Sequence, residues 1–285
     1  IAAYRAPIIP DLPPLQGGVM GYLGYDTIRE VEHLPHVPHD DRGFPDASAL
    51  AAGSLAAVEP ERQRVDLGES VPARDEHAGP RDRENDEACV RVQRAVDKLS
   101  QPLSSPAAEP PQLGEAAPEV RSSMADGVYQ QAVEVAKEHI LAGDIFQVVL
   151  AQRYDIDLQA DPFDFYRVLR QVNPSPYMYF LRHPDITIAG SSPEPMVKVL
   201  GRTVVSRPIA GTRRRGRTDD DDRRMAGELK ENPKEVAEHI MLVDLARNDV
   251  GRVAEFGTVQ VSELMSLERY SHVMHLTSQV TGELV

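Results

Sequence analysis

The sequence contains very little cysteine and no long apolar run. Cys89 is the only cysteine in 285 residues, which excludes an intramolecular disulfide framework and a cysteine-rich metal site and favours a reducing compartment. No apolar stretch approaches the roughly 18 residues of a membrane-spanning helix, and the sequence shows no secretory signal pattern. We therefore expect a cytoplasmic protein without a membrane partner.

The sequence is also short of positive charge. Its 31 lysines and arginines are outnumbered by 45 aspartates and glutamates, which gives a formal net charge of −14. This excess of acid argues against a nucleic-acid partner and against docking on anionic lipid, because both need surplus lysine and arginine. A hydrophobic fraction of 41% with 27% charged residues predicts a globular protein of one large or two ordinary domains.

Proline divides the chain into two parts, which we expect to be residues 1–118 and 119–285. Fifteen of the 23 prolines lie in the first part. A glycine-rich run at 17–25 predicts a strand whose glycines allow close backbone approach, and 45–67 contains a further strand segment. Residues 68–118 are mostly polar and rich in proline, which is typical of a linker.

The second part mixes helical and strand-like patterns. Hydrophobic spacing and cap residues predict helices over about 122–142, 162–172, 221–231 and 233–246. Short apolar runs predict strands over 145–154, 177–181, 187–190, 196–200, 203–207, 258–264 and 272–281. Hairpins mixed with helices indicate an α+β fold with mixed, largely antiparallel sheets and packed helices.

The helix expected over 233–246 combines apolar residues around almost its whole circumference with a pair of glutamates. The apolar residues predict that it is buried. Glu235 and Glu238 nevertheless lie three positions apart on one face, and buried ionised carboxylates need partners. Ion pairs with Lys234 or neighbouring arginines are one interpretation. Coordination of a hard cation such as Mg²⁺ is the other.

Two further polar residues lie in or beside predicted strands. Gln147 falls at the centre of the strand expected over 145–154, where its amide needs hydrogen-bond partners. Glu194 follows a strand and lies between two prolines that fix its backbone. Such a rigid loop suits a catalytic acid, although most glutamates of this kind simply face water.

An arginine-rich stretch follows residue 212. Four aspartates, Asp219–Asp222, come directly after it, so we expect the two sets of charges to offset each other rather than to bind nucleic acid. Gly211 and Thr212 precede the stretch and offer a backbone N–H and a hydroxyl to a small carboxylate. His275 lies in the last strand-like run, where it can enter a site as a base or donor or pack in the core.

Six segments occur in one order along the second part: 143–153, 173–181, 191–194, 208–212, 235–252 and 270–280. Together they resemble the chorismate-utilising enzymes, and within that family the anthranilate synthase component I branch. The resemblance covers 119–285 and the run at 17–34. It implies that 1–118 is the remainder of an amino-terminal regulatory region and linker. It also implies that 119–285 is the first part of a chorismate-binding catalytic domain whose fold is incomplete here.

The resemblance assigns roles to the polar residues. Glu238 corresponds to a ligand of Mg²⁺, which clamps the ring carboxylate of chorismate, and Glu235 supports the metal shell. Glu194 corresponds to a general acid that protonates the departing C4 hydroxyl, which requires a raised pKa. His275 corresponds to a histidine implicated in pyruvate elimination. The substrate-contact pair consists of Gly211 and Thr212. The feedback site for tryptophan includes Pro176, Tyr177 and Met178.

Two positions separate the branches of this family. Relatives that add water carry a lysine base where this chain has Gln147, and aminodeoxychorismate synthases carry lysine where it has Ala210. The combination implies direct amination of chorismate by ammonia, followed by loss of pyruvate to give anthranilate in tryptophan biosynthesis. The resemblance implies that a glutamine amidotransferase subunit supplies the ammonia and that tryptophan inhibits the enzyme.

Two alternatives stay open. One is aminodeoxychorismate synthase component I, and the other is a catalytically inactive truncated product that acts only in subunit interactions. Further Mg²⁺-ligating glutamates, a substrate-binding arginine, a glycine-rich carboxylate loop and an amino-terminal tryptophan-binding element of the family have no counterpart in these 285 residues. We therefore expect the chain alone to have very low or no synthase activity.

Overall fold

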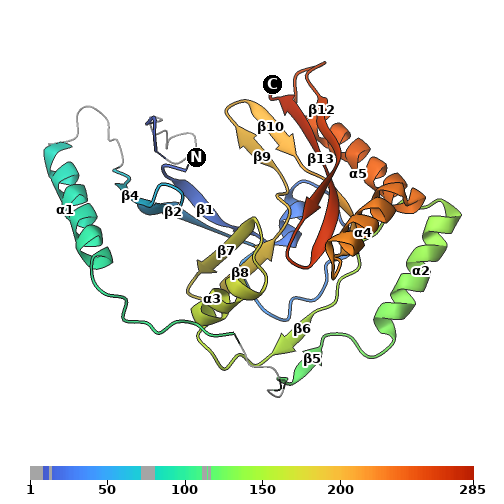
Figure 1. The fold of residues 1–285 in the computed structure, drawn as a ribbon, viewed down its shortest axis with the longest axis horizontal. Coiled ribbons are helices and arrows are strands. Elements are labelled where there is room, and N and C mark those ends of the chain that lie inside the picture. The colour runs from blue at the N-terminus through green and yellow to red at the C-terminus, as the bar shows by residue number, and fades with distance from the viewer. Residues whose placement is uncertain (1–8, 13–14, 72–80, 111–113, 115–116) are drawn as a thin grey trace. The chain divides into compact units, whose positions relative to one another are not determined.

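The computed structural model describes residues 9–12, 15–71, 81–110, 114 and 117–285. The chain forms two compact units (Figure 1). The first contains residues 1–107 and 183–186, and the second contains 108–182 and 187–285. Parts of the predicted linker, 72–80, 111–113 and 115–116, lie outside the described residues. The functional division expected between residues 118 and 119 stays a prediction.

The first unit contains two antiparallel hairpin-like pairs. Strand β1 (Gly18–Leu23) pairs with β2 (Ala47–Ala52), and β3 (Ser54–Glu59) pairs with β4 (Arg64–Glu69). A 3₁₀ helix, η1 (Tyr25–Glu30), follows β1. Helix α1 (Arg81–Leu99) packs against β4.

Glycine in β1 allows the close backbone approach that its sequence predicts. A Cβ atom on Gly21 would lie only 1.8 Å from the carbonyl oxygen of Ser48 on the paired strand. Because real Cβ atoms do not approach backbone atoms so closely, a larger residue here would force the two strands apart.

The second unit is built around an antiparallel sheet whose longest strand is β13 (Val273–Glu283). Strand β12 (Gln260–Arg269) runs along one side of β13. Two shorter strands, β10 (Thr203–Ser206) and β11 (Ile209–Arg214), share its other side. Strand β9 (Lys198–Leu200) pairs with β10. This mixture of helices and antiparallel strands confirms the predicted fold class.

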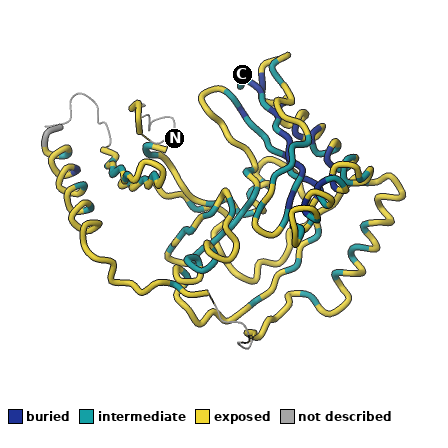
Figure 2. Tube along the Cα trace, in the orientation of Figure 1, coloured by how far each residue is buried: buried dark blue, intermediate teal, exposed yellow. Residues whose placement is uncertain are grey.

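Helices α4 (Asp219–Glu231) and α5 (Pro233–Gly251) pack against this sheet (Figure 1). Their N-terminal N–H groups are capped by the side chains of Thr218 and Asn232. Figure 2 shows that burial is concentrated where the helices meet β13. The core beneath them includes Val204, Leu229, Val243, Ala246, Val250, Met274, Leu276 and Val280.

The expectation that α5 is buried all round is wrong. Its buried residues are His239, Val243, Ala246 and Val250, which follow one stripe of the helix. Ile240 is 40% exposed because the sheet covers one face of the helix only. On the buried face, His239 Nε2 lies 2.6 Å from Ser278 Oγ of β13, which ties the helix to the sheet.

A single helix between two short paired strands precedes the sheet in the second unit. Helix α2 (Val128–Ala142) ends, as predicted, where Gly143 adopts a left-handed conformation. The strand expected over 145–154 is wrong, because only β6 (Tyr154–Ile156) forms there, paired with β5 (Val120–Ser122).

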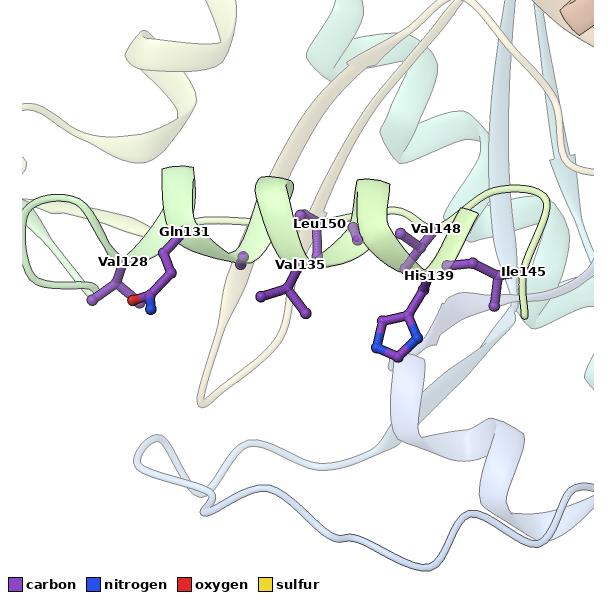
Figure 3. Close-up of a pocket in the computed structure, with 9 residues that line it drawn as sticks. Val128, Gln131, Val135, His139, Ile145, Val148 and Leu150 are labelled. Atoms are coloured by element: carbon purple, nitrogen blue, oxygen red, sulfur yellow. The ribbon is translucent and has the colours of Figure 1, made fainter. Parts of the chain in front are cut away.

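The reason for this error is that a strand needs a partner. The apolar run at 145–150 has high β-propensity, but no described strand lies beside it. Phe146 and Val149 are therefore 91% and 86% exposed. Ile145, Val148 and Leu150 instead line an apolar groove along α2 (Figure 3).

Helix α3 (Pro162–Val172) and the hairpin of β7 (Tyr177–Arg182) and β8 (Thr187–Ser192) agree with the sequence. Asp161 caps α3 by accepting from the N–H of Phe163 over 2.7 Å. The ring of Phe163 meets that of Phe180 on β7 edge-on, with centroids 5.2 Å apart. Among the described residues, none of the helices combines the length and apolar character needed to cross a membrane.

Candidate active site

Strand β11 is the element around which the predicted site residues gather, although the sequence analysis did not predict it. Its centre is a bulge between Ala210 and Thr212, where Gly211 has a φ of +77°. A Cβ on Gly211 would lie 3.1 Å from Leu229 Cδ1 and 3.3 Å from Glu235 Oε2. Glycine is therefore required both by the left-handed backbone and by the crowding around it.

Glu194 reaches β11 from the loop after β8. Its Oε1 accepts a hydrogen bond from the backbone N–H of Ile209 over 3.0 Å. Ser192 fixes the loop, because its Oγ contacts both the carbonyl oxygen and the N–H of Glu194. Burial raises the pKa of the Glu194 carboxyl above its usual range, and the bond from Ile209 offsets part of this rise. The residue as a whole is nevertheless exposed to solvent.

His275 lies beside the same bulge on β13. Its Nδ1 is 3.0 Å from Thr212 Oγ1, and the two residues are directly opposite each other in the sheet. Burial lowers the pKa of His275, while a hydrogen bond with the Gly211 backbone acts in the opposite direction. The arrangement favours a neutral imidazole with one ring nitrogen already engaged.

The two glutamates of α5 differ in their surroundings. Glu235 Oε1 accepts from Arg213 Nη1 over 3.0 Å, and its side chain is only 15% exposed. Glu238 is half-buried one turn later and has no hydrogen bond or ion pair to the described part of the chain. The ion-pair interpretation therefore fits Glu235, which is paired with Arg213. The cation interpretation stays open for Glu238, whose carboxylate oxygens are available.

A metal ion would find only part of a coordination shell here. Within the described residues, no three His, Cys, Asp or Glu side chains come together in a way that could hold a metal ion. Mg²⁺ nevertheless binds through as few as one or two carboxylates and retains water molecules. The donor set of Glu238, with Glu235 beside it, fits that pattern.

The segment predicted to bind tryptophan is a direct neighbour of the Glu194 loop. In the β7–β8 hairpin, Tyr177 pairs with Ser192 and Met178 pairs with Ser191. Pro176 immediately precedes this pairing. The sequence alone did not indicate that the two predicted sites share one hairpin.

The structure does not bring Gln147 to this site. The residue is exposed in the non-strand segment after α2, and the described residues provide no hydrogen-bond partner for it. Its predicted place at the centre of a strand is therefore wrong, because no described strand lies beside this run. Its catalytic role stays a prediction.

Sequence reasoning missed several charged and polar residues around the site. Arg213 holds Glu235, while Arg207 and Tyr270 both bind Glu268 on β12. Arg213 belongs to the arginine-rich stretch after residue 212, and the sequence suggested ion pairs with arginines without identifying it, whereas Arg207 precedes that stretch. A strand register would have revealed Glu268, because it lies directly opposite His275.

This fold agrees with comparisons to known proteins. The family described as "chorismate binding enzyme" matches residues 3–285, so the chain belongs to that family. Anthranilate synthase component 1 from Cereibacter sphaeroides is 43% identical over 292 residues, which cover 100% of this chain and 56% of that protein. Anthranilate synthase alpha subunit 1 from Arabidopsis thaliana is 58% identical over 156 residues, which cover 55% of this chain and 26% of that protein.

A solved structure supports the same assignment. Anthranilate synthase component I from Streptococcus pneumoniae matches with a TM-score of 0.84 and 32% identity, covering 100% of this chain and 61% of that one. The chain spans about half the length of the curated component 1 relatives that it matches. The catalytic, substrate and metal roles of individual residues stay predictions.

Proposed function

We propose that this chain supplies chorismate-binding and catalytic residues of an anthranilate synthase component 1. The observation that carries the proposal is the convergence on β11 of three groups from separate elements. Glu194 is held at Ile209, Glu235 lies beside Gly211, and His275 contacts Thr212. The similarity to component 1 proteins along the whole chain supports the same function.

The proposed reaction adds an amino group at C2 of chorismate and removes the hydroxyl from C4. Ammonia attacks C2, the ring double bonds shift, and the C4 hydroxyl leaves as water after protonation by Glu194. Removal of the C2 proton and cleavage of the bond between C3 and the enolpyruvyl oxygen then give anthranilate, and the released enolpyruvate takes up a proton to become pyruvate. The raised pKa of Glu194 supports its role, because an acid must still carry its proton at the working pH. His275 serves the elimination step as a base or hydrogen-bond donor.

Binding of a dianion by an acidic protein requires local positive charge. Mg²⁺ would supply it at the ring carboxylate, with Glu238 as the ligand and Glu235 in support. Arg213 keeps the Glu235 carboxylate in a fixed orientation at the first turn of α5. The N–H of Gly211 and the hydroxyl of Thr212 are the substrate contacts in this proposal.

The choice of nucleophile rests on two side chains. Gln147 and Ala210 stand where family members with other chemistries carry lysine, which favours ammonia over water and direct amination over a covalent intermediate. A glutamine amidotransferase subunit is the proposed source of ammonia. Tryptophan is the proposed inhibitor, bound at Pro176, Tyr177 and Met178. The pairing of this segment with Ser191 and Ser192 supports communication with Glu194.

Product analysis tests this proposal. The complete open reading frame that encodes these residues is expressed and incubated with chorismate, Mg²⁺ and ammonium chloride. We expect the fluorescence and mass of anthranilate together with an equal amount of pyruvate. Aminodeoxychorismate without pyruvate would establish the rival amination instead. Absence of chorismate turnover, in a preparation whose folding is verified by circular dichroism, would contradict an enzymatic role.

A further inference from the structure

His275 stands in a row of side chains that crosses three strands. Thr212 of β11 is directly opposite His275 of β13, and Glu268 of β12 is directly opposite it on the other side. Directly opposed residues of antiparallel strands place their side chains on the same face of the sheet, with Cβ atoms about 5 Å apart. The imidazole therefore lies between a hydroxyl and a carboxylate.

Two side chains hold the carboxylate at the end of this row. Arg207 Nη2 donates to Glu268 Oε1, and the hydroxyl of Tyr270 donates to Glu268 Oε2 over 2.5 Å. Burial alone would raise the pKa of Glu268, but the bonds from Tyr270 and Arg207 outweigh it and place that pKa below its usual range. Burial and the bond to Glu268 raise the pKa of Tyr270 to about 12, so its hydroxyl keeps its proton and donates.

Tyr270 also touches the histidine itself. Its ring centroid is 5.5 Å from that of His275, with 59° between the ring planes. The Tyr270 N–H donates to the carbonyl oxygen of Val273 over 2.8 Å, which fixes the turn between β12 and β13. The imidazole is thus bounded by Thr212, Glu268 and Tyr270, and the last two are bonded to each other.

We propose that Glu268 and Tyr270 act as a pair of positioning residues that fix the imidazole of His275 for the elimination step. The expected effect on kcat rests on the proposed function, whereas the expected effect on the position of the imidazole does not. Glu268 flanks the ring opposite Thr212, Tyr270 covers it, and Arg207 prevents the carboxylate from turning away. An ionised carboxylate beside the ring also stabilises a proton that the imidazole takes up, and it offsets part of the lowering of the His275 pKa that burial causes.

Two nearly isosteric variants test the pair. Tyr270→Phe keeps the ring and removes the bond to Glu268, and Glu268→Gln keeps the shape and removes the charge. Glu255→Gln is the matched control, because Glu255 also pairs with an arginine, Arg202, and is not part of the His275 row.

The kinetic readout uses the complete open reading frame. We expect kcat for anthranilate formation to fall about ten- to hundredfold in Glu268→Gln and by a smaller factor in Tyr270→Phe, because small misplacements of a catalytic group have effects of that size. KM should stay within about twofold in both, since the proposal assigns neither residue a contact with the substrate. A kcat within about twofold of the parent in both variants would overturn the proposal.

An NMR readout separates this proposal from the proposed function. The ¹⁵N shifts of the His275 imidazole report its tautomer and hydrogen bonding, and they need no substrate. We expect them to change in Tyr270→Phe and Glu268→Gln but not in Glu255→Gln. Unchanged shifts in the first two would refute the positioning role even if the enzyme is active. Changed shifts in a protein that does not consume chorismate would refute the proposed function and leave the positioning role supported.

Discussion

The backbone N–H of Ile209 and the carboxylate of Glu194 are joined by a 3.0 Å hydrogen bond across 15 positions of sequence. The bond places a carboxyl group of raised pKa beside the Gly211 bulge. Because it engages only Oε1, the second oxygen stays available to carry a proton. Several expected outcomes follow from this arrangement and its surroundings.

Glu194→Gln should separate activity from stability. We expect kcat to fall by about 10²- to 10⁴-fold, which is the usual contribution of a general acid. A carboxyl group with a raised pKa stabilises the fold only below its ordinary pKa and loses that contribution as pH rises through the folded-state value. The amide should therefore leave the Tm at pH 7 unchanged or slightly higher. A variant that keeps full activity would remove Glu194 from the mechanism.

Gly211→Ala should damage both the fold and the site. The left-handed φ of +77° and the two close contacts together should cost about 2–4 kcal/mol of unfolding free energy. Gly201→Ala is the control, since Gly201 has a φ of +62° but no atom within 4 Å of its Cβ position. The Gly201→Ala substitution should cost only about 1–2 kcal/mol of unfolding free energy. Equal losses in urea unfolding would show that crowding at Gly211 does not matter.

Asp222→Asn should destabilise the chain in a pH-dependent way. Hydrogen bonds from Arg215 and the Gly216 N–H, together with Arg269, lower the pKa of Asp222 from 3.8 to about 2. A lowered pKa stabilises the fold above the unfolded value of 3.8, and this stabilisation is lost as pH falls toward 2. We expect the Tm to fall by about 3 °C or more at pH 6.

The same variant should differ little from the parent near pH 2. Asp220→Asn is the matched control, because Asp220 forms only an exposed pair with Arg223. The Tm of this control variant should differ from that of the parent by less than about 1 °C. Thermal unfolding followed by circular dichroism at both pH values measures these differences. A Tm loss in Asp222→Asn that is the same at pH 6 and pH 2 would argue against the ionic origin.

The two glutamates of α5 should respond differently to Mg²⁺. Glu238→Gln should raise the Mg²⁺ concentration for half-maximal activity by more than about a hundredfold or abolish the dependence, because it removes a proposed ligand. Glu235→Gln should raise it by about ten- to hundredfold, as expected for a supporting residue. Glu228→Gln, on the exposed face of α4, should have no effect. Full Mg²⁺-dependent activity in Glu238→Gln would contradict the metal assignment.

Local signals predicted much of this structure. The cap at Asp161, the stop at Gly143 and the cap at Asn232 each set a helix boundary, because the chemistry of a helix end is written in a few adjacent residues. The signal for the strand at 17–25 was equally local.

What sequence could not supply was the pairing of distant strands. β11 lacks a clear alternation of apolar and polar residues and has a glycine at its centre. Its place in the site therefore became visible only from its register with β13. The interstrand pairing of Glu268 with His275 was invisible for the same reason. Conversely, the run at 145–150 has strong strand propensity and forms no strand, because propensity does not provide a neighbour.

That unpaired run has a consequence for handling the protein. Ile145-Phe146-Gln147-Val148-Val149-Leu150 is an uncharged segment of high β-propensity without proline or glycine, and such hexapeptides stack into cross-β assemblies. Most of this segment is exposed, and no described strand pairs with its backbone. Its N–H and C=O groups can therefore hydrogen-bond to a strand of another chain. The chain should therefore aggregate on concentration, and Val149→Lys, at a side chain that is 86% exposed, should act as a gatekeeper that keeps it in solution.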